Sequence, residues 1–188
     1  MVQHTNRRSK ARVVKTTWPQ TTGLGQTTSE IRDAILSAAL HYGVAGNLAL
    51  AVAQQESGLI PQASSPVGAI GIFQLMPATA AWLGVDPWDW QQNVDGGVRY
   101  LKYLLDKFGT DLHVVLAAYN WGEGNVSQAI KNYGANWLTF APLETRNYVG
   151  TITASLGTST ASPGVLTAGL NNTTVALLII AGFLLLRS

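Results

Sequence analysis

The chain of 188 residues contains no cysteine, and charged residues make up only 12% of it. Without cysteine there can be neither a disulfide framework nor a thiolate metal site. The three histidines are scattered along the chain without the spacing of metal ligands. We therefore predict that the protein binds no metal and needs no cofactor. Charged residues usually make up about a quarter of a globular chain, so this chain is poor in charge.

Alternating polar and apolar runs are also lacking, which argues against a fold rich in strands. Helical spacing is present instead between the two ends of the chain. Thr27 and Glu30 have the spacing of a capping box, which predicts the start of a helix; Asn47, Asp95 and Asp111 are predicted to cap later helices. The predicted helical segments after the first are residues 48–55, 77–83, 95–108, 111–118, 126–133 and 143–156. Residues 29–156 are thus expected to form one all-α domain, with at most a trace of β structure in a glycine-rich loop.

Positive charge is concentrated at the N-terminus, where residues 1–20 hold five of the twelve Lys and Arg residues and none of the ten acidic ones. Residues 1–28 are polar, and Pro19 and Gly23 interrupt any regular element, so we predict a flexible arm. A basic arm can bind nucleic acid or anionic lipid, and a solvated tail is the plainer alternative. The arm has no apolar stretch of the kind that a secretory signal needs.

The C-terminus combines a polar segment with an apolar one. Residues 157–174 are rich in Gly, Ser, Thr and Asn and are predicted to be a linker. Residues 175–186 are twelve consecutive apolar residues, whereas a straight membrane-spanning helix needs about 20. Extending the segment back to Val165 gives 22 residues, interrupted by uncharged polar groups that can be satisfied locally. We predict a C-terminal membrane anchor; the alternative is an apolar tail that packs against a partner protein.

Glu56 is an acidic residue whose sequence context predicts a raised pKa. Glu56 follows the apolar segment 48–55 and precedes a polar loop that is broken by glycines. A carboxyl group held against apolar walls ionises less readily, so its pKa rises toward neutrality. Such a group can donate a proton and later take one back, as a general acid and base. Glu56 is therefore the first candidate for a catalytic residue.

Three separated blocks of sequence carry a resemblance to a known family. Residues 55–61 read QESGLIP and are followed over 64–77 by SSPVGAIGIFQLMP; residues 117–122 read AAYNWG, and residues 144–149 read ETRNYV. In this order they resemble the soluble lytic transglycosylase family, from about Ser29 to about Leu156. The resemblance implies a lysozyme-like fold and an enzyme that cuts the glycan strands of bacterial peptidoglycan.

The resemblance also implies a reaction with a single carboxylate. Most glycoside hydrolases use two, but between Glu56 and Asp86 this sequence has no other acid. In the family, the glutamate protonates the bond between N-acetylmuramic acid and N-acetylglucosamine. The resemblance implies that the N-acetyl group of the substrate then traps the anomeric carbon. The ionised glutamate then takes the proton of the 6-hydroxyl, which gives a 1,6-anhydromuramoyl end and consumes no water.

Six further residues match family positions that bind the glycan. They are Ser65, implied to contact the N-acetyl group and the acid; Gln74 and Met76, implied to bind the neighbouring sugar; Tyr119 and Asn120, implied to line the groove; and Tyr148, implied to donate a hydrogen bond near the acid. Two places depart from the family pattern. Residues 121–124 read WGEG where the family has a small residue and then GPG, and Ile60 replaces a common asparagine.

Tryptophans near the candidate site have two interpretations, the core and the stacking of sugars. Trp82, Trp88 and Trp90 are predicted to belong to the core, because cores of helical domains also take tryptophan. Trp121 is the better candidate for stacking, since it lies inside the second block.

The predicted location follows from combining this activity with the chain ends. An enzyme without an export signal but with a C-terminal anchor can reach the cell wall from inside a virus particle. We therefore predict a virion-associated, membrane-associated enzyme of a bacteriophage that opens the wall locally when the genome is delivered. The alternatives are an accessory enzyme of bacterial secretion or conjugation, a murein-remodelling enzyme of the bacterial inner membrane, a lysozyme-type hydrolase, and a non-catalytic wall-binding membrane protein. The predicted partners are peptidoglycan strands and a membrane.

Overall fold

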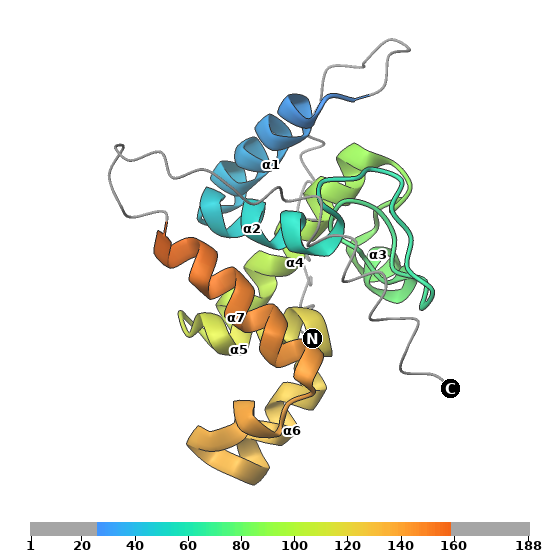
Figure 1. Cartoon of the computed structure of the whole chain (residues 1–188). Coiled ribbons are helices and arrows are strands. Elements are labelled where there is room, and N and C mark those ends of the chain that lie inside the picture. The colour runs from blue at the N-terminus through green and yellow to red at the C-terminus, as the bar shows by residue number, and fades with distance from the viewer. Residues whose placement is uncertain (1–25, 159–188) are drawn as a thin grey trace, which may run out of the picture.

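The computed structural model describes residues 26–158, a domain built of helices (Figure 1). The elements in chain order are α1 (Thr28–Tyr42), α2 (Gly46–Ser57), α3 (Pro77–Leu83), α4 (Trp90–Phe108), α5 (Leu112–Trp121), α6 (Glu123–Tyr133), the 3₁₀ helix η1 (Gly134–Phe140) and α7 (Leu143–Thr158). The predicted membrane segment, residues 159–174 of the predicted linker and residues 1–25 of the predicted arm lie outside the described residues. Residues 157 and 158, predicted to begin the linker, belong to α7 instead. No helix within residues 26–158 is both long and apolar enough to cross a membrane.

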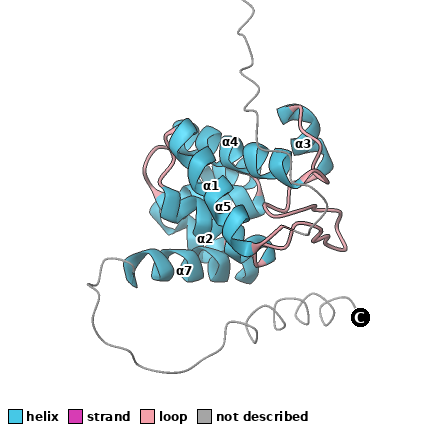
Figure 2. Ribbon diagram, turned by 90° about the horizontal axis from the view of Figure 1, so that it is seen from above, coloured by secondary structure: helices cyan, strands magenta, loops and turns pink. Residues whose placement is uncertain are grey.

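Helix α5 lies near the centre of the domain, with the other helices around it (Figure 2). All five residues of its segment 114–118 are buried, as expected of a helix that is apolar on every side. Helix α5 packs against α4, α6 and α7, and the N-terminal pair α1 and α2 closes the core by packing on α4 and α7 respectively. This arrangement brings the C-terminal end of α2 beside α7, although the two helices are far apart in the sequence.

The predicted start of the first helix is confirmed. Thr27 Oγ1 accepts a hydrogen bond from the backbone N–H of Glu30 (3.2 Å), and Glu30 Oε2 accepts one from the backbone N–H of Thr27 (2.7 Å). The predicted cap at Asp111 is also present, since its carboxylate accepts from the backbone N–H of His113. Both caps satisfy N–H groups that the first turn of a helix leaves without partners.

Two predicted caps are wrong. Helix α2 begins at Gly46 with Ala45 at the cap position, and Asn47 lies inside its first turn. Helix α4 begins at Trp90 and is capped by Asp89, so Asp95 lies more than one turn inside it. There Asp95 accepts a hydrogen bond from the hydroxyl of Tyr42 (2.6 Å). The sequence offered two acidic residues near this helix start, and the helical apolar spacing continues upstream to the first of them. Helix η1 was not predicted.

A loop of residues 58–76 joins α2 to α3 and lies against α4 (Figure 1). Two isolated antiparallel bridges, Ser64 with Ile70 and Ile70 with Leu75, fold it onto itself. They are the trace of β structure that the sequence indicated, and residues 26–158 contain no longer strand.

The side chain of Asn93 on α4 holds this loop in place. Asn93 is fully buried. Its Oδ1 accepts from the backbone N–H of Phe73 (2.8 Å), and its Nδ2 donates to the carbonyls of Ile70 (2.8 Å) and Pro87 (3.0 Å). Gly97, one turn further along α4, lets Phe73 pack against the helix, because a Cβ there would lie 2.1 Å from the Phe73 ring. The loop residues that follow Phe73 are thereby fixed relative to α4 and α5.

Candidate active site

Glu56 lies at the C-terminal end of α2, one residue before the helix ends. Tyr148 of α7 donates a hydrogen bond from its hydroxyl to Glu56 Oε1, at 2.7 Å. Part of the Glu56 surface is open to solvent, yet protein atoms surround the carboxyl group densely enough to desolvate it. The acid is therefore inset in the domain surface and accessible from one side.

The pKa of Glu56 is raised from its ordinary 4.5 to about 7. Burial is the largest cause, since it disfavours the charged form. The hydrogen bond from Tyr148 acts in the opposite direction, because it stabilises the carboxylate, and the negative charge of Glu144 raises the pKa again. Glu56 is consequently poised to exchange a proton near neutral pH.

Two tyrosine hydroxyls lie close to this carboxyl group and stay protonated. Tyr148 and Tyr119 both have a pKa well above the ordinary 10, first because they are buried and next because of the charge of Glu56. The hydroxyl of Tyr119 donates to the backbone carbonyl of Phe73 (2.9 Å). Helix α5 is thereby joined to the loop that Asn93 holds.

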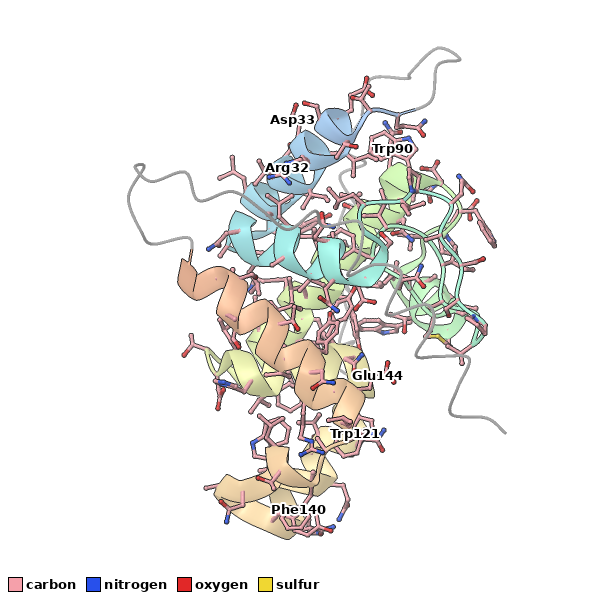
Figure 3. All side chains as sticks on the ribbon, in the orientation of Figure 1. Arg32, Asp33, Trp90, Trp121, Phe140 and Glu144 are labelled. Carbon is pink, nitrogen blue, oxygen red and sulfur yellow. The ribbon has the colours of Figure 1, made fainter. Side chains whose placement is uncertain are left out.

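A cavity of about 240 Å³ lies beside the acid. Its walls come from the end of the loop, from α3, α4 and α5, and from the residue after α5: Gln74, Leu75, Met76, Thr79, Tyr100, Tyr119, Asn120, Trp121 and Gly122. Glu56 itself is outside this set. Tyr119 connects Glu56 with the cavity, because it lines the cavity and is close enough to Glu56 for the charge of that carboxylate to raise its pKa. In Figure 3, Trp121, which lines the cavity, and Glu144, whose charge acts on Glu56, both lie in the lower part of the view. They are on the opposite side from Arg32 and Asp33 on α1.

The predicted residues of the loop reach this cavity in different ways. Gln74 has a left-handed backbone (φ 45°), which is strained for a residue other than glycine. Its Nε2 donates to the carbonyls of Gly71 (2.8 Å) and Ala63 (3.3 Å), so the side chain also holds the loop together. Met76 is 43% exposed and forms an apolar wall.

Asn120 is oriented by a residue that the sequence interpretation missed. Its Oδ1 accepts a hydrogen bond from the hydroxyl of Thr145 on α7 (2.8 Å), and Thr145 is buried. The Asn120 side chain is thereby fixed at the cavity wall. The signal available was the position of Thr145 inside the third sequence block.

Residues 33–137, more than half of the chain, match the family of transglycosylase SLT domains. The chain belongs to this family. It is similar to the transglycosylase of Enterobacteria phage PRD1, with 38% identity over 121 residues that cover 64% of this chain and 40% of the phage protein. It is also similar to membrane-bound lytic murein transglycosylase F 1 of Alkalilimnicola ehrlichii, with 42% identity over 99 residues, or 49% of this chain and 20% of that protein.

The solved 70 kDa soluble lytic transglycosylase of Escherichia coli has a similar fold, with a TM-score of 0.60 and 31% identity over 65% of this chain and 23% of that one. The predicted all-α, lysozyme-like fold class is thus confirmed for the described domain. The chain spans 40% or less of the length of these three relatives.

The hydrogen bonds of Ser65 in this SLT domain lie within its own loop. Its Oγ accepts from the backbone N–H of Ala69 (3.0 Å), and its own N–H donates to the Ala69 carbonyl (2.9 Å). These two bonds close the turn before the glycine-rich part of the loop. Within the described residues no hydrogen bond joins Ser65 to Glu56, so its contact with the acid stays a prediction.

The departure from the family pattern at residues 121–124 is explained by local contacts. Glu123 begins α6 and accepts hydrogen bonds from the hydroxyl of Tyr103 (2.9 Å) and from Lys107 Nζ (2.7 Å). The bond to Lys107 is the main reason that the pKa of Glu123 is lowered. A proline at this position could accept neither bond with its side chain, so Glu123 gives this chain a link from α6 to α4.

The tryptophans divide differently from the prediction. Trp90 packs against the core, as expected, but Trp82 is 60% exposed and Trp88 is 51% exposed. The prediction of a core position for these two is therefore wrong. Trp82 lies in the last turn of the short helix α3, and Trp88 lies between α3 and α4. As for metals, no group of three His, Asp or Glu side chains in residues 26–158 can hold an ion.

Proposed function

We propose that this protein is a peptidoglycan lytic transglycosylase that cleaves the bond between N-acetylmuramic acid and N-acetylglucosamine and leaves 1,6-anhydromuramoyl ends. Membership of the SLT family supports this activity. The observation that carries the proposal is the carboxyl group of Glu56, whose pKa of about 7 lies close to neutral pH beside a cavity with polar and aromatic walls. Such a group is half protonated near neutral pH, which suits one residue acting first as acid and then as base.

In the first step, protonated Glu56 gives its proton to the bridging oxygen, and the bond from that oxygen to the anomeric carbon breaks. The hydrogen bond from Tyr148 stabilises the carboxylate that forms, since a donor favours the charged form. In the second step, the carboxylate takes the proton of the 6-hydroxyl while that oxygen bonds to the anomeric carbon. Glu56 is then protonated again, and no water has been used.

The residues of the cavity bind the sugars in this proposal. Gln74, Asn120 and Tyr119 provide polar groups at the wall, and Met76 provides an apolar surface for the sugar beside the acid. Ser65 is proposed to reach the N-acetyl group with its hydroxyl hydrogen, because the hydrogen bond from Ala69 uses the oxygen only as an acceptor.

A lysozyme-type hydrolase is the nearest rival, and the mass of the products separates the two. We expect digestion of purified peptidoglycan to give muropeptides with anhydro ends. Hydrolysis would add one water, about 18 Da, and leave a reducing end, as follows from the contrast between the two reactions. Mass spectrometry of the separated muropeptides measures this difference directly. Products that carry reducing ends throughout would replace the proposal with a hydrolase.

We further propose that the enzyme acts in the particle of a bacteriophage, associated with a membrane, and opens the wall during genome delivery. The similarity to a phage transglycosylase and to a membrane-bound bacterial one supports an origin in a virion or at a membrane. Antibodies against residues 26–158 are expected to detect the protein in purified virions. Detection in host membranes with none in the particle would favour a bacterial accessory or murein-remodelling enzyme.

A further inference from the structure

Four aromatic side chains form a continuous row that starts at the cavity and ends on the surface. We call Tyr119, Tyr100, Tyr103 and Trp82 the aromatic row. The ring centroids of Tyr119 and Tyr100 are 5.2 Å apart, and those of Tyr100 and Tyr103 are 6.2 Å apart. Trp82 contacts both inner rings of α4, at 6.4 Å from Tyr100 and 5.0 Å from Tyr103. The row thus leads from Tyr119, which lies near Glu56, to the exposed Trp82.

The inner part of the row is held rigidly. The hydroxyl of Tyr103 donates to Glu123 (2.9 Å), and Lys107 lies over the Tyr103 ring, 5.6 Å from its centroid. Lys107 and Glu123 pair with each other, so they add no net charge beside the rings. A surface whose side chains are already fixed loses little conformational entropy when a ligand binds.

The outer end of the row is open. Trp82 is 60% exposed, and it lies on α3 three residues after Thr79, which lines the cavity. Residues three apart on a helix are neighbours on its surface. The exposed face of Trp82 therefore continues the wall of the cavity outward along α3, with Tyr100 shared between the cavity and the row.

We propose that the aromatic row is a binding subsite for the glycan strand beyond the two sugars at Glu56, with Trp82 as its outer stacking residue. This inference rests on the proposed function, because it takes peptidoglycan as the ligand. Sugar rings have apolar faces of C–H groups, and a rigid aromatic surface whose neighbouring charges are paired with each other fits such faces. The continuity of the row with the cavity favours the same strand over a separate ligand.

The test compares long glycan strands with a disaccharide substrate, which occupies only the two sugar positions at Glu56. For Trp82→Ala in the full chain, we expect the KM for long strands to rise roughly three- to tenfold, the range that one aromatic contact supplies. The kcat and the KM for the disaccharide are expected to stay unchanged. Trp88→Ala is the matched control, since Trp88 is exposed to a similar extent and lies outside the row. Trp82→Leu keeps an apolar contact with Tyr103 without a ring face and replaces Trp82→Ala if that variant does not fold.

Binding measured in a Glu56→Gln background separates this proposal from the proposed function. Calorimetric titration with long strands is expected to show the same three- to tenfold loss when Trp82 is replaced. If the wild type makes no anhydro product but this loss persists, the subsite stands and the proposed reaction fails. Equal affinity with and without Trp82, or an equal loss for long and short substrates, would overturn the subsite.

Discussion

Replacing Glu56 with glutamine is expected to slow glycan cleavage by roughly 10²- to 10⁴-fold, the range that a general acid–base group supplies. Glutamine keeps the size of the side chain and can still accept a hydrogen bond from Tyr148, but it has no proton to give to the bridging oxygen. The release of soluble muropeptides by the purified variant measures the effect, and zymography on peptidoglycan gels shows it qualitatively. Asp106→Asn, which removes an exposed carboxylate, is the matched control. A Glu56→Gln variant that clears peptidoglycan like the wild type would remove Glu56 from the reaction.

Thermal unfolding of Glu56→Gln shows whether the variant is folded, and its dependence on pH tests the raised pKa of Glu56. The pKa of Glu56 is about 7 in the folded state against 4.5 ordinarily, so between these values the folded state holds a proton that the unfolded state has lost. Stability therefore falls as the pH rises from about 4.5 to about 7, by up to about 3 kcal/mol. Glutamine has no group that ionises in this range, so the Glu56→Gln variant does not lose this stability as the pH rises. We expect Glu56→Gln to melt higher than the wild type at pH 8 and equally at pH 4, and equal melting at both would contradict the shifted pKa.

Replacing Asn93 with alanine is expected to lower the free energy of unfolding by about 3–4 kcal/mol. The substitution leaves the buried Phe73 N–H without its partner, and an unsatisfied group of this kind costs about 1–3 kcal/mol. It also removes the bonds from Asn93 to the carbonyls of Ile70 and Pro87, although Ile70 still accepts from the Leu75 N–H. Urea unfolding of the two proteins measures the difference. We expect activity to fall as well, because Gln74 and Met76 follow directly on the segment that Asn93 holds.

A suitable control for Asn93→Ala is Asn132→Ala on the exposed face of α6. Its Oδ1 accepts from Gln128 one turn away, in an exposed place, so its removal is expected to change stability by no more than about 0.5 kcal/mol. If Asn93→Ala unfolded as the wild type does, the loop would be held by its own bridges and by Gln74 instead.

Local signals in the sequence were sufficient for much of the fold. The capping box of Thr27 and Glu30 and the cap at Asp111 are formed within one turn, and short spacing rules describe such contacts well. The predicted start of α4 was wrong because Asp89 and Asp95 are equally good caps when only the local sequence is considered. The choice between them depends on Asn93, whose long-range bonds fix the register of the helix, and these bonds have no signature in the local sequence.

The candidate site was predictable only in part for a similar reason. Apolar residues before Glu56 indicate a hydrophobic setting, but the partner Tyr148 is 92 residues away. Only the resemblance to a family connected the two. Thr145 and Tyr100 look like ordinary helix residues in the sequence. The place of Tyr100 at the cavity, and the hydrogen bond from Thr145 to Asn120, follow from how α4, α5 and α7 pack. Trp82 was misassigned because the exposure of a tryptophan depends on what packs over its ring, here residues of α4 on one side, and the local sequence does not record that.

The hydrogen bond between the second and the last helix has a consequence for how the molecule matures. Glu56 leaves the ribosome early, but the hydroxyl that it needs arrives only with residue 148. A growing or shortened chain that stops before Leu143 has neither this donor nor the covering surface of α7. The proton-transfer pair of Glu56 and Tyr148 is therefore complete only in a chain that includes α7.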